Sequence, residues 1–255
     1  MRELRIGVIG TGLMGCEHIR NVLALDGARI TAVSDPHETS LVWAQKNLGE
    51  SACDVGMFGD HRDLLTSGLI DAVIVASPNF THVDVLRDVL ATEIPVLVEK
   101  PMCTSIRDCQ DIVLAAENRS AITWVGLEYR YMAPIAKLLE VIRSGELGEL
   151  KMLAIREHRF PFLVKVDNWN RFSRNTGGTL VEKCCHFFDL MNLAIGARPL
   201  RVYASGGQDV NHLEEIYENE RADILDNAFV IVDYANGVRA SLDLCMFAES
   251  GRNEQ

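Results

Sequence analysis

The sequence feature that most constrains this chain is the spacing of three glycines, Gly10, Gly12 and Gly15, directly after the apolar run Leu4–Ile9 and before a helical pattern over residues 13–25. In such a unit the first glycine permits a tight turn, the second lets the backbone approach a pyrophosphate, and the third lets helix and strand pack closely. The free N–H groups of the new helix attract phosphate. The pattern therefore predicts a dinucleotide site rather than a plain strand–turn–helix connection. The cofactor contacts expected here are Gly10, Thr11, Gly12, Leu13, Met14 and Gly15.

Asp35 refines this prediction. It lies twenty residues after Gly15, at the end of a second apolar run, residues 30–33. A carboxylate there can accept hydrogen bonds from both hydroxyls of the adenosine ribose, and it would repel a 2′-phosphate. No arginine occurs between Asp35 and Glu38. We therefore expect NAD rather than NADP; the alternative is that Asp35 and Pro36 form an ordinary turn.

The composition is acidic, with 25 basic against 36 acidic residues and a net charge of −11 over 255 residues. This charge argues against nucleic acid or an anionic membrane surface as the main partner. No apolar run is long enough to span a bilayer, so we expect a cytoplasmic protein. The seven cysteines are scattered and odd in number, which favours reduced thiols over a disulfide framework, and no spacing predicts a metal site.

The first part of the chain, residues 1–124, alternates strand and helix patterns, as a parallel sheet with helical crossovers would. Gly10, Asp35, Ser77 and Lys100 each follow a predicted strand, and ligands of such sheets bind outside the carboxyl ends of the strands. We therefore expect one cofactor-binding edge. The predicted strands are 4–9, 30–33, 70–76, 95–99 and 122–126, and the predicted helices are 13–25, 40–48, 81–90 and 105–118.

The second part, residues 125–255, has a different pattern. Asn236 and Gly237 separate two strand-like runs, which is a strong hairpin signal, and apolar residues alternate with polar ones after Val238. These features predict a largely antiparallel sheet with one buried face and one long helix, residues 179–195. The predicted strands are 150–156, 200–205, 226–234 and 238–247, and a further helix is expected at 133–143.

Together these motifs resemble the Gfo/Idh/MocA family of oxidoreductases. The residues that carry the resemblance are the run Gly10 to Gly15, Ser77-Pro78-Asn79 with His82, Glu99-Lys100-Pro101, and Gly177-Gly178 leading to His186 and Asp189. The resemblance implies an α/β protein, with a Rossmann-type NAD-binding domain (residues 1–124) followed by an α+β domain with an open-faced, largely antiparallel sheet (residues 125–255). It also implies NAD(P)-dependent oxidation or reduction of a sugar, inositol or related polyol, and a homo-oligomer formed through the second-domain sheet.

The chain departs from the family pattern in two places. Glu182 stands where relatives usually carry Asp, and Cys184 stands where they carry Gly. Relatives also continue for roughly another hundred residues, so the resemblance implies a second domain that is incomplete at its C-terminal end.

The expected chemistry needs a hydride acceptor and a base for the hydroxyl proton. Lys100 and His186 are the candidates for handling that proton, with Glu182 orienting His186 from the same helical face. The alternatives are a surface lysine, a packing histidine, and a Glu182 that serves only in a capping box begun by Thr179. Asp189 is expected to make a structural contact.

The remaining site predictions follow from the resemblance and the order of the strands. Cofactor contacts are expected from Ser77, Pro78, Asn79, His82, Glu99, Lys100, Glu128 and Arg171. Substrate contacts are expected from Lys100, Arg156, His158, Trp169, Glu182 and His186.

Three other functions remain open for this sequence. A glycosidase that uses NAD for transient oxidation would produce no net NADH. A non-catalytic NAD or sugar sensor would have no need for the proton relay of Lys100 and His186. A reductase for a non-sugar carbonyl or imine would have an apolar pocket in its second domain.

Overall fold

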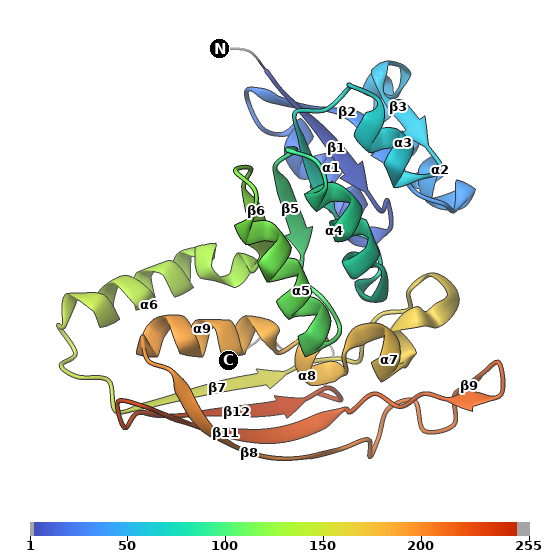
Figure 1. Cartoon of the computed structure of the whole chain (residues 1–255). Helices are drawn as coiled ribbons and strands as arrows, with labels where there is room; N and C mark the ends of the chain where they lie inside the picture. Colours follow the sequence, from blue (N-terminus) through green and yellow to red (C-terminus); the bar gives the residue numbers. More distant parts are fainter. Residues whose placement is uncertain (1–2, 249–255) are drawn as a thin grey trace. The chain divides into compact units, whose positions relative to one another are not determined.

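The computed structural model describes residues 3–248 and divides into two compact units, Met1–Gly126 and Leu127–Gln255 (Figure 1). The first unit is built on a six-stranded sheet in which every paired neighbour is parallel. Its spatial order is β3-β2-β1-β4-β5-β6, the doubly wound arrangement expected for a Rossmann-type domain. The strands are β1 Leu4–Ile9, β2 Ala28–Ser34, β3 Gly56–Phe58, β4 Ala72–Val75, β5 Val96–Glu99 and β6 Thr123–Gly126.

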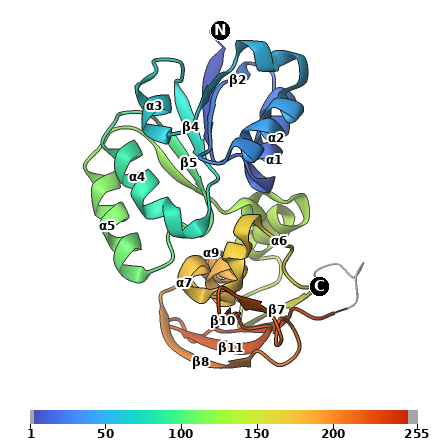
Figure 2. The ribbon, with the colours of Figure 1, turned by 90° about the vertical axis from the view of Figure 1, so that its right-hand side faces the viewer.

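Helices cover both faces of this sheet. One apolar cluster joins β1 and β2 to α1 and α2, and a second joins β4 and β5 to α3, α4 and α5. Figure 2 shows α1 and α2 on one side of the strands and α3, α4 and α5 on the other. The helices are α1 Leu13–Leu23, α2 Glu38–Leu48, α3 His61–Thr66, α4 His82–Leu90 and α5 Ile106–Glu117, with short 3-10 turns η1 Gly49–Asp54 and η2 Asn79–Thr81.

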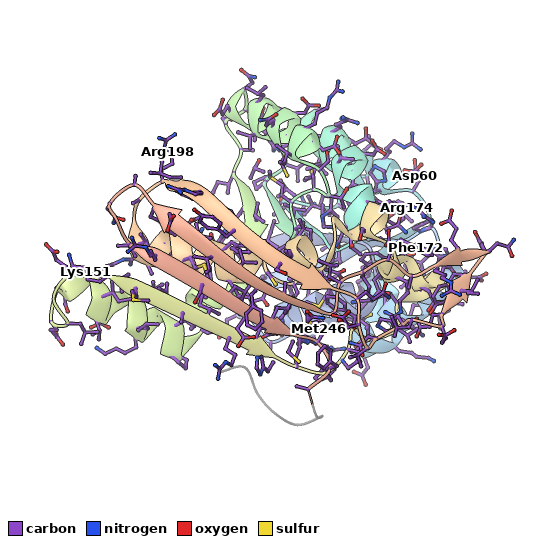
Figure 3. The ribbon with its side chains drawn as sticks, turned by 90° about the horizontal axis from the view of Figure 1, so that it is seen from below. Asp60, Lys151, Phe172, Arg174, Arg198 and Met246 are labelled. Atoms are coloured by element: carbon purple, nitrogen blue, oxygen red, sulfur yellow. The ribbon has the colours of Figure 1, made fainter. Side chains whose placement is uncertain are left out.

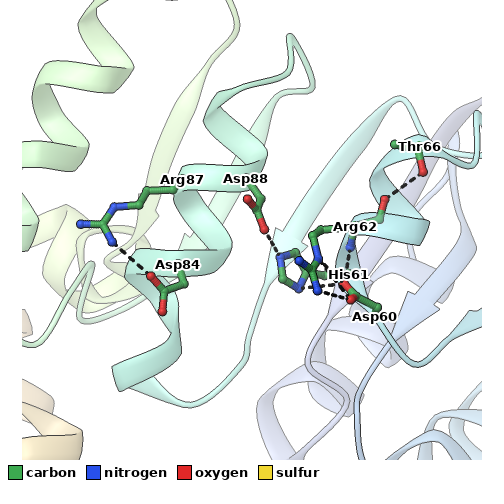
Figure 4. A network of polar contacts seen from close by, with 7 residues as sticks. All are labelled: Asp60, His61, Arg62, Thr66, Asp84, Arg87 and Asp88. Carbon is green, nitrogen blue, oxygen red and sulfur yellow. Dashed lines mark hydrogen bonds and ion pairs between the residues drawn. The ribbon is translucent and has the colours of Figure 1, made fainter.

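A polar network on the surface links α3 to α4 (Figure 4). The His61 imidazole lies 2.7 Å from the carboxylate of Asp88 and 3.6 Å from that of Asp60. Asp60 is the N-cap of α3 and accepts a hydrogen bond from the backbone N–H of Arg62. His61 therefore contacts both Asp60, which caps α3, and Asp88 of α4.

The second unit is built on a four-stranded sheet of order β7-β12-β11-β8. The pairs β12–β11 and β11–β8 are antiparallel and β7–β12 is parallel, so the sheet is mostly antiparallel, as predicted. In the hairpin turn the Gly237 N–H donates to Tyr234 O at 2.9 Å, and Gly237 adopts φ +83°, which favours glycine. The four strands are β7 Met152–His158, β8 Pro199–Gly207, β11 Asn227–Tyr234 and β12 Arg239–Cys245. A separate antiparallel pair is formed by β9 Ile216–Tyr217 and β10 Glu220–Arg221.

One face of this sheet is covered and the other is open. Val230 and Val232 of β11 and Leu242 of β12 are buried against Phe187 and Met191 of α9. On the opposite face Phe229 and Ile231 alternate with the buried positions and are 66% and 46% exposed. Figure 3 views the sheet from that open side. The other helices are α6 Ala133–Ser144, α7 Ser173–Thr176, α8 Thr179–Glu182 and α9 Cys185–Ile195, with 3-10 turns η3 Glu128–Tyr131 and η4 Val166–Arg171.

The structure corrects the predicted long helix over residues 179–195. The helix is interrupted at Lys183 and Cys184, so Glu182 ends α8 and His186 lies in α9. The alternative of a capping box begun by Thr179 is also wrong. Gly178, and not Thr179, is the N-cap of α8, and the Thr179 hydroxyl donates to Leu225 O at 2.6 Å. Among residues 3–248, no helix has both the length and the apolar character needed to span a membrane.

Candidate functional site

The glycine loop has the geometry that a bound pyrophosphate needs. A Cβ on Gly10 would lie 2.5 Å from Ser77 N, and a Cβ on Gly15 would lie 1.9 Å from Gly10 O, so neither position has room for a side chain. A Cβ on Gly12 would meet no atom within 4 Å, which leaves open space over the start of α1. No side chain caps α1 at Gly12, and the first turn of this fully described helix holds no acidic residue. The loop therefore fits the phosphates of a dinucleotide.

Asp35 is 7% exposed and joins the end of β2 to the glycine loop. Its Oδ2 accepts hydrogen bonds from Thr11 N at 2.8 Å and Thr11 Oγ1 at 3.3 Å, while Oδ1 accepts from His37 N at 2.9 Å. These two backbone donors and one hydroxyl donor fix the carboxylate at the carboxyl edge of the sheet. The position suits a ribose contact, because each carboxylate oxygen can accept more than one hydrogen bond.

His82 ties together the segments that follow β4 and β5. Its Nδ1 lies 2.8 Å from Pro101 O and its Nε2 lies 2.9 Å from Ser77 O. Burial lowers the pKa of His82 below its usual value, although both carbonyl contacts oppose the shift. The Lys100–Pro101 peptide bond is cis. Leu13 and Met14 are exposed at the start of α1, and Asn79 is buried.

Glu99 precedes Lys100 and is held by a residue that the sequence reasoning missed. The His18 Nε2 of α1 lies 2.7 Å from Glu99 Oε1, and Glu99 Oε2 accepts a hydrogen bond from Lys100 N at 3.1 Å. Burial raises the pKa of Glu99, but the hydrogen bond and charge of His18, together with Lys100, outweigh it, so the pKa lies below its ordinary value. His18 could have been noticed as a histidine three residues after Gly15, in the helix that the glycine loop begins.

In the second unit, His186 is 3% exposed and packs against η3. The Tyr129 ring stacks on the imidazole with centroids 4.1 Å apart and planes 7° from parallel. Glu128 Oε1 lies 3.8 Å from His186 Nε2, and Glu128 is about half exposed. The structure thus brings two predicted site residues, Glu128 and His186, together, and adds Tyr129 to them. Glu182 is buried at the end of α8.

A buried ion pair lies beside this cluster and was not predicted. Lys183 Nζ lies 3.0 Å from Glu157 Oε1 and donates to Tyr129 Oη at 2.7 Å. Glu157 lies on the inward face of β7, together with Leu153 and Ile155. An acidic residue in an inward position of a strand is the signal that could have revealed it.

Other predicted residues have different surroundings. Asp189 accepts a bidentate pair of hydrogen bonds from Arg130 of η3. The sequence predicted a structural contact from the helix to the sheet, and the partner is instead a residue of a 3-10 turn. Arg171 is 3% exposed and its Nε donates to Glu215 at 3.1 Å. Trp169 lies in η4 and is partly buried.

Arg156 and His158 are not brought together with His186. Both contact Asp243 of β12, at 3.1 Å and 3.0 Å. Because strand residues alternate between faces and Glu157 points inward, Arg156 and His158 lie on the open face of the sheet. We therefore leave them out of the proposed substrate site. Among residues 3–248, no group of three or more His, Cys, Asp or Glu side chains could hold a metal ion.

Comparison with known proteins extends these observations. The sequence model described as an oxidoreductase family with an NAD-binding Rossmann fold matches residues 4–127, and the C-terminal alpha/beta domain of the same oxidoreductase family matches residues 140–255.

Two curated relatives cover nearly the whole chain. The chain is 31% identical over 251 residues to inositol 2-dehydrogenase of Pseudarthrobacter chlorophenolicus, covering 97% of this chain and 68% of the relative. It is 26% identical over 243 residues to the uncharacterized oxidoreductase YrbE of Bacillus subtilis, covering 95% of this chain and 67% of the relative. The chain thus spans about two thirds of the length of these relatives.

A solved structure shares the fold. The crystal structure of myo-inositol dehydrogenase from Lactobacillus casei in complex with NAD(H) and myo-inositol matches with a TM-score of 0.81 at 22% identity. The match covers 99% of this chain and 70% of the other.

Proposed function

Because the chain belongs to the Gfo/Idh/MocA family of NAD-binding oxidoreductases, we propose that it transfers a hydride between NAD and a secondary alcohol carbon of a sugar, inositol or related polyol. We assign cofactor binding to residues 1–124 and substrate binding and assembly to residues 125–255. The names of the inositol dehydrogenase relatives support a polyol as the substrate class.

The observation that supports this proposal most strongly is the alignment of four functional positions along one sheet edge. Gly10, Asp35, Ser77 and Lys100 follow β1, β2, β4 and β5, and these strands are parallel and adjacent. An edge that carries a phosphate-binding turn, a ribose-binding carboxylate and an amine suits a nicotinamide reaction better than simple nucleotide storage.

The proposed chemistry divides the work among the residues of this chain. When bound, the nicotinamide ring supplies the hydride acceptor. Lys100 donates a hydrogen bond to the substrate oxygen, and His186 takes the hydroxyl proton as the carbon gives up its hydride and the C=O bond forms. Glu182 and Glu128 stabilise the protonated imidazole. In the reduction, His186 returns the proton to the substrate oxygen.

We also propose that the open face of the second-unit sheet mediates a homo-oligomer. Four exposed apolar side chains mark this face, and exposed apolar patches of this kind are typical of association sites. They are Met152, Tyr203, Phe229 and Ile231.

A substrate panel tests the proposed reaction. NADH absorbance is followed with NAD and a series of inositols, aldoses and sugar acids, and we expect net NADH formation with at least one polyol. Release of an aglycone without net NADH would instead favour the transient-redox glycosidase. NAD binding without any turnover would favour the sensor.

Lys100→Ala provides the matched test of the site. We expect turnover to fall by at least about a hundredfold, because a positioned proton-handling group contributes that much, while NAD affinity stays within about twofold. Lys46→Ala on the exposed face of α2 is the control. A Lys100→Ala enzyme with near wild-type turnover would remove Lys100 from the mechanism.

A further inference from the structure

We propose that Lys183 is a positioning residue that acts on His186 through Tyr129. The buried ammonium group anchors the Tyr129 hydroxyl, and the anchored phenol ring fixes the plane of the His186 imidazole. This inference rests on the proposed function, in which His186 takes the substrate proton, and it identifies the residues that set the orientation of that base.

Lys183 is held from two directions at the break between α8 and α9. Its Nζ donates to Tyr129 Oη at 2.7 Å and lies 3.0 Å from Glu157 Oε1. The side chain of Lys183 is 7% exposed and that of Glu157 is fully buried. Because the helix is interrupted over Lys183 and Cys184, Lys183 is not part of either helix and points into the core of the unit.

Tyr129 connects this ion pair to His186. Its ring stacks on the imidazole with a centroid separation of 4.1 Å and an angle of 7°. The edge of the same ring meets Phe187, with centroids 5.7 Å apart and planes at 68°. A tyrosine side chain has two main torsions, so fixing its hydroxyl and packing its ring leaves it one position. Because the two rings stack in parallel, the fixed Tyr129 ring restricts the plane of the His186 imidazole.

Stability alone does not explain this arrangement. Burying an ammonium and a carboxylate carries a large desolvation cost, and a well-packed apolar pair of similar size is often as stable or more so. The surroundings are buried: the neighbouring Cys184 is 0% exposed, and burial raises the pKa of its thiol to about 12. Arg159 also lies near Glu157, with Nη1 3.7 Å from Oε1. We therefore attribute the buried pair of Lys183 and Glu157 to the orientation that it gives Tyr129 and, through Tyr129, His186.

Three acidic side chains lie near His186 along the chain or in space. Glu128 approaches Nε2 from one direction at 3.8 Å and is half exposed. Asp189, one helical turn away on α9, is engaged by Arg130. Glu182 lies across the helix break. Tyr129 differs from these side chains because its ring covers the face of the imidazole.

Three variants distinguish a change in the orientation of His186 from a loss of folding. Lys183→Met alone leaves the Glu157 charge buried, which can unfold the protein, so it is combined with Glu157→Gln. Tyr129→Phe keeps the stacked ring and removes only the hydroxyl. The triple variant combines all three changes. Lys137→Met, at an exposed position of α6, is the control and should match wild type.

Two readouts are measured on each folded variant: kinetics with NAD and a polyol substrate, and the ring-proton NMR signal of His186 in histidine-labelled protein, assigned with His186→Gln. We expect Lys183→Met/Glu157→Gln and Tyr129→Phe each to lower kcat about tenfold to a hundredfold, the range caused by small misplacements of a catalytic group. The KM for NAD should change less than about twofold. The His186 signal should shift, and the triple variant should lose no more activity than the double.

Wild-type kcat together with an unmoved His186 signal in folded Lys183→Met/Glu157→Gln would overturn the inference, as would losses that multiply in the triple variant. Failure of the proposed function is recognised separately: no substrate then yields NADH with the wild-type protein. In that case the His186 signal still decides whether Lys183 positions the ring.

Discussion

The His18 imidazole lies 2.7 Å from the Glu99 carboxylate, so the helix that begins at the glycine loop is tied to the residue directly before Lys100. The cofactor-binding loop and the proposed catalytic lysine are thereby linked within one unit. The contact crosses from α1 to the end of β5, which are far apart in the sequence.

Glu99→Gln should destabilise the protein at neutral pH. Because the folded-state pKa of Glu99 is lowered, its contribution to stability is present above the ordinary glutamate pKa and is lost as the pH falls through the folded-state pKa. We expect a loss of about 1–2 kcal/mol in the free energy of unfolding at pH ~7, shrinking below pH ~4. Urea unfolding at both pH values measures it, with exposed Glu17→Gln as the control. A loss that does not depend on pH would contradict the account.

Asp35→Ala should change cofactor preference. The carboxylate accepts hydrogen bonds from Thr11 N and His37 N, and a ribose hydroxyl would share its remaining lone pairs. We expect the Kd for NAD to rise roughly tenfold and the Kd for NADP to rise less, because Asp35 repels the 2′-phosphate. Fluorescence titration with both cofactors gives the ratio, and exposed Asp26→Ala serves as control. An unchanged ratio would refute the ribose assignment.

Gly12→Ala and Gly15→Ala should have opposite consequences. A methyl group on Gly15 would meet Gly10 O at 1.9 Å, so we expect a loss of stability of about 2 kcal/mol or more. A methyl group on Gly12 would enter open space, so stability should hold while NAD binding weakens. Thermal unfolding with and without NAD distinguishes the two. Equal melting temperatures for both variants would show that the loop packs differently.

Replacing Phe229 and Ile231 by Glu should disrupt the proposed oligomer without unfolding the unit. Both side chains lie on the open face, away from the core, so charge there opposes association but leaves the buried positions intact. Light scattering on size-exclusion fractions should report a smaller particle than wild type. Phe187→Glu in the core would instead unfold the protein. If the double variant keeps the wild-type mass, assembly does not use this face.

Much of the fold follows from local patterns in the sequence. The apolar run before Gly10 and the Asn236-Gly237 turn predicted β1 and the β11–β12 hairpin because strand periodicity and turn chemistry are local signals. No range was predicted for β3, Gly56–Phe58, whose three residues are all only partly buried and show no alternation. The helix break at Lys183 was also missed, because every residue from Glu182 to His186 tolerates a helix.

The site was only partly predictable for a related reason. Glycine spacing and strand ends are visible in the sequence, so Gly10, Asp35 and Lys100 could be named. The contacts of His18 with Glu99 and of Lys183 with Glu157 join residues far apart in the chain, and no local pattern records them. Strand alternation could have placed Arg156 on the face opposite Glu157, which the resemblance alone did not do.

The proposed function requires that Lys100 and His186 act on one substrate oxygen. A crystal structure of the protein with NADH and a polyol substrate tests it most directly. We expect Lys100 Nζ and His186 Nε2 both to lie within roughly 3 Å of the same hydroxyl oxygen, at the carbon that faces the nicotinamide. A bound polyol whose reacting oxygen contacts only one of these two groups, or neither, would contradict it.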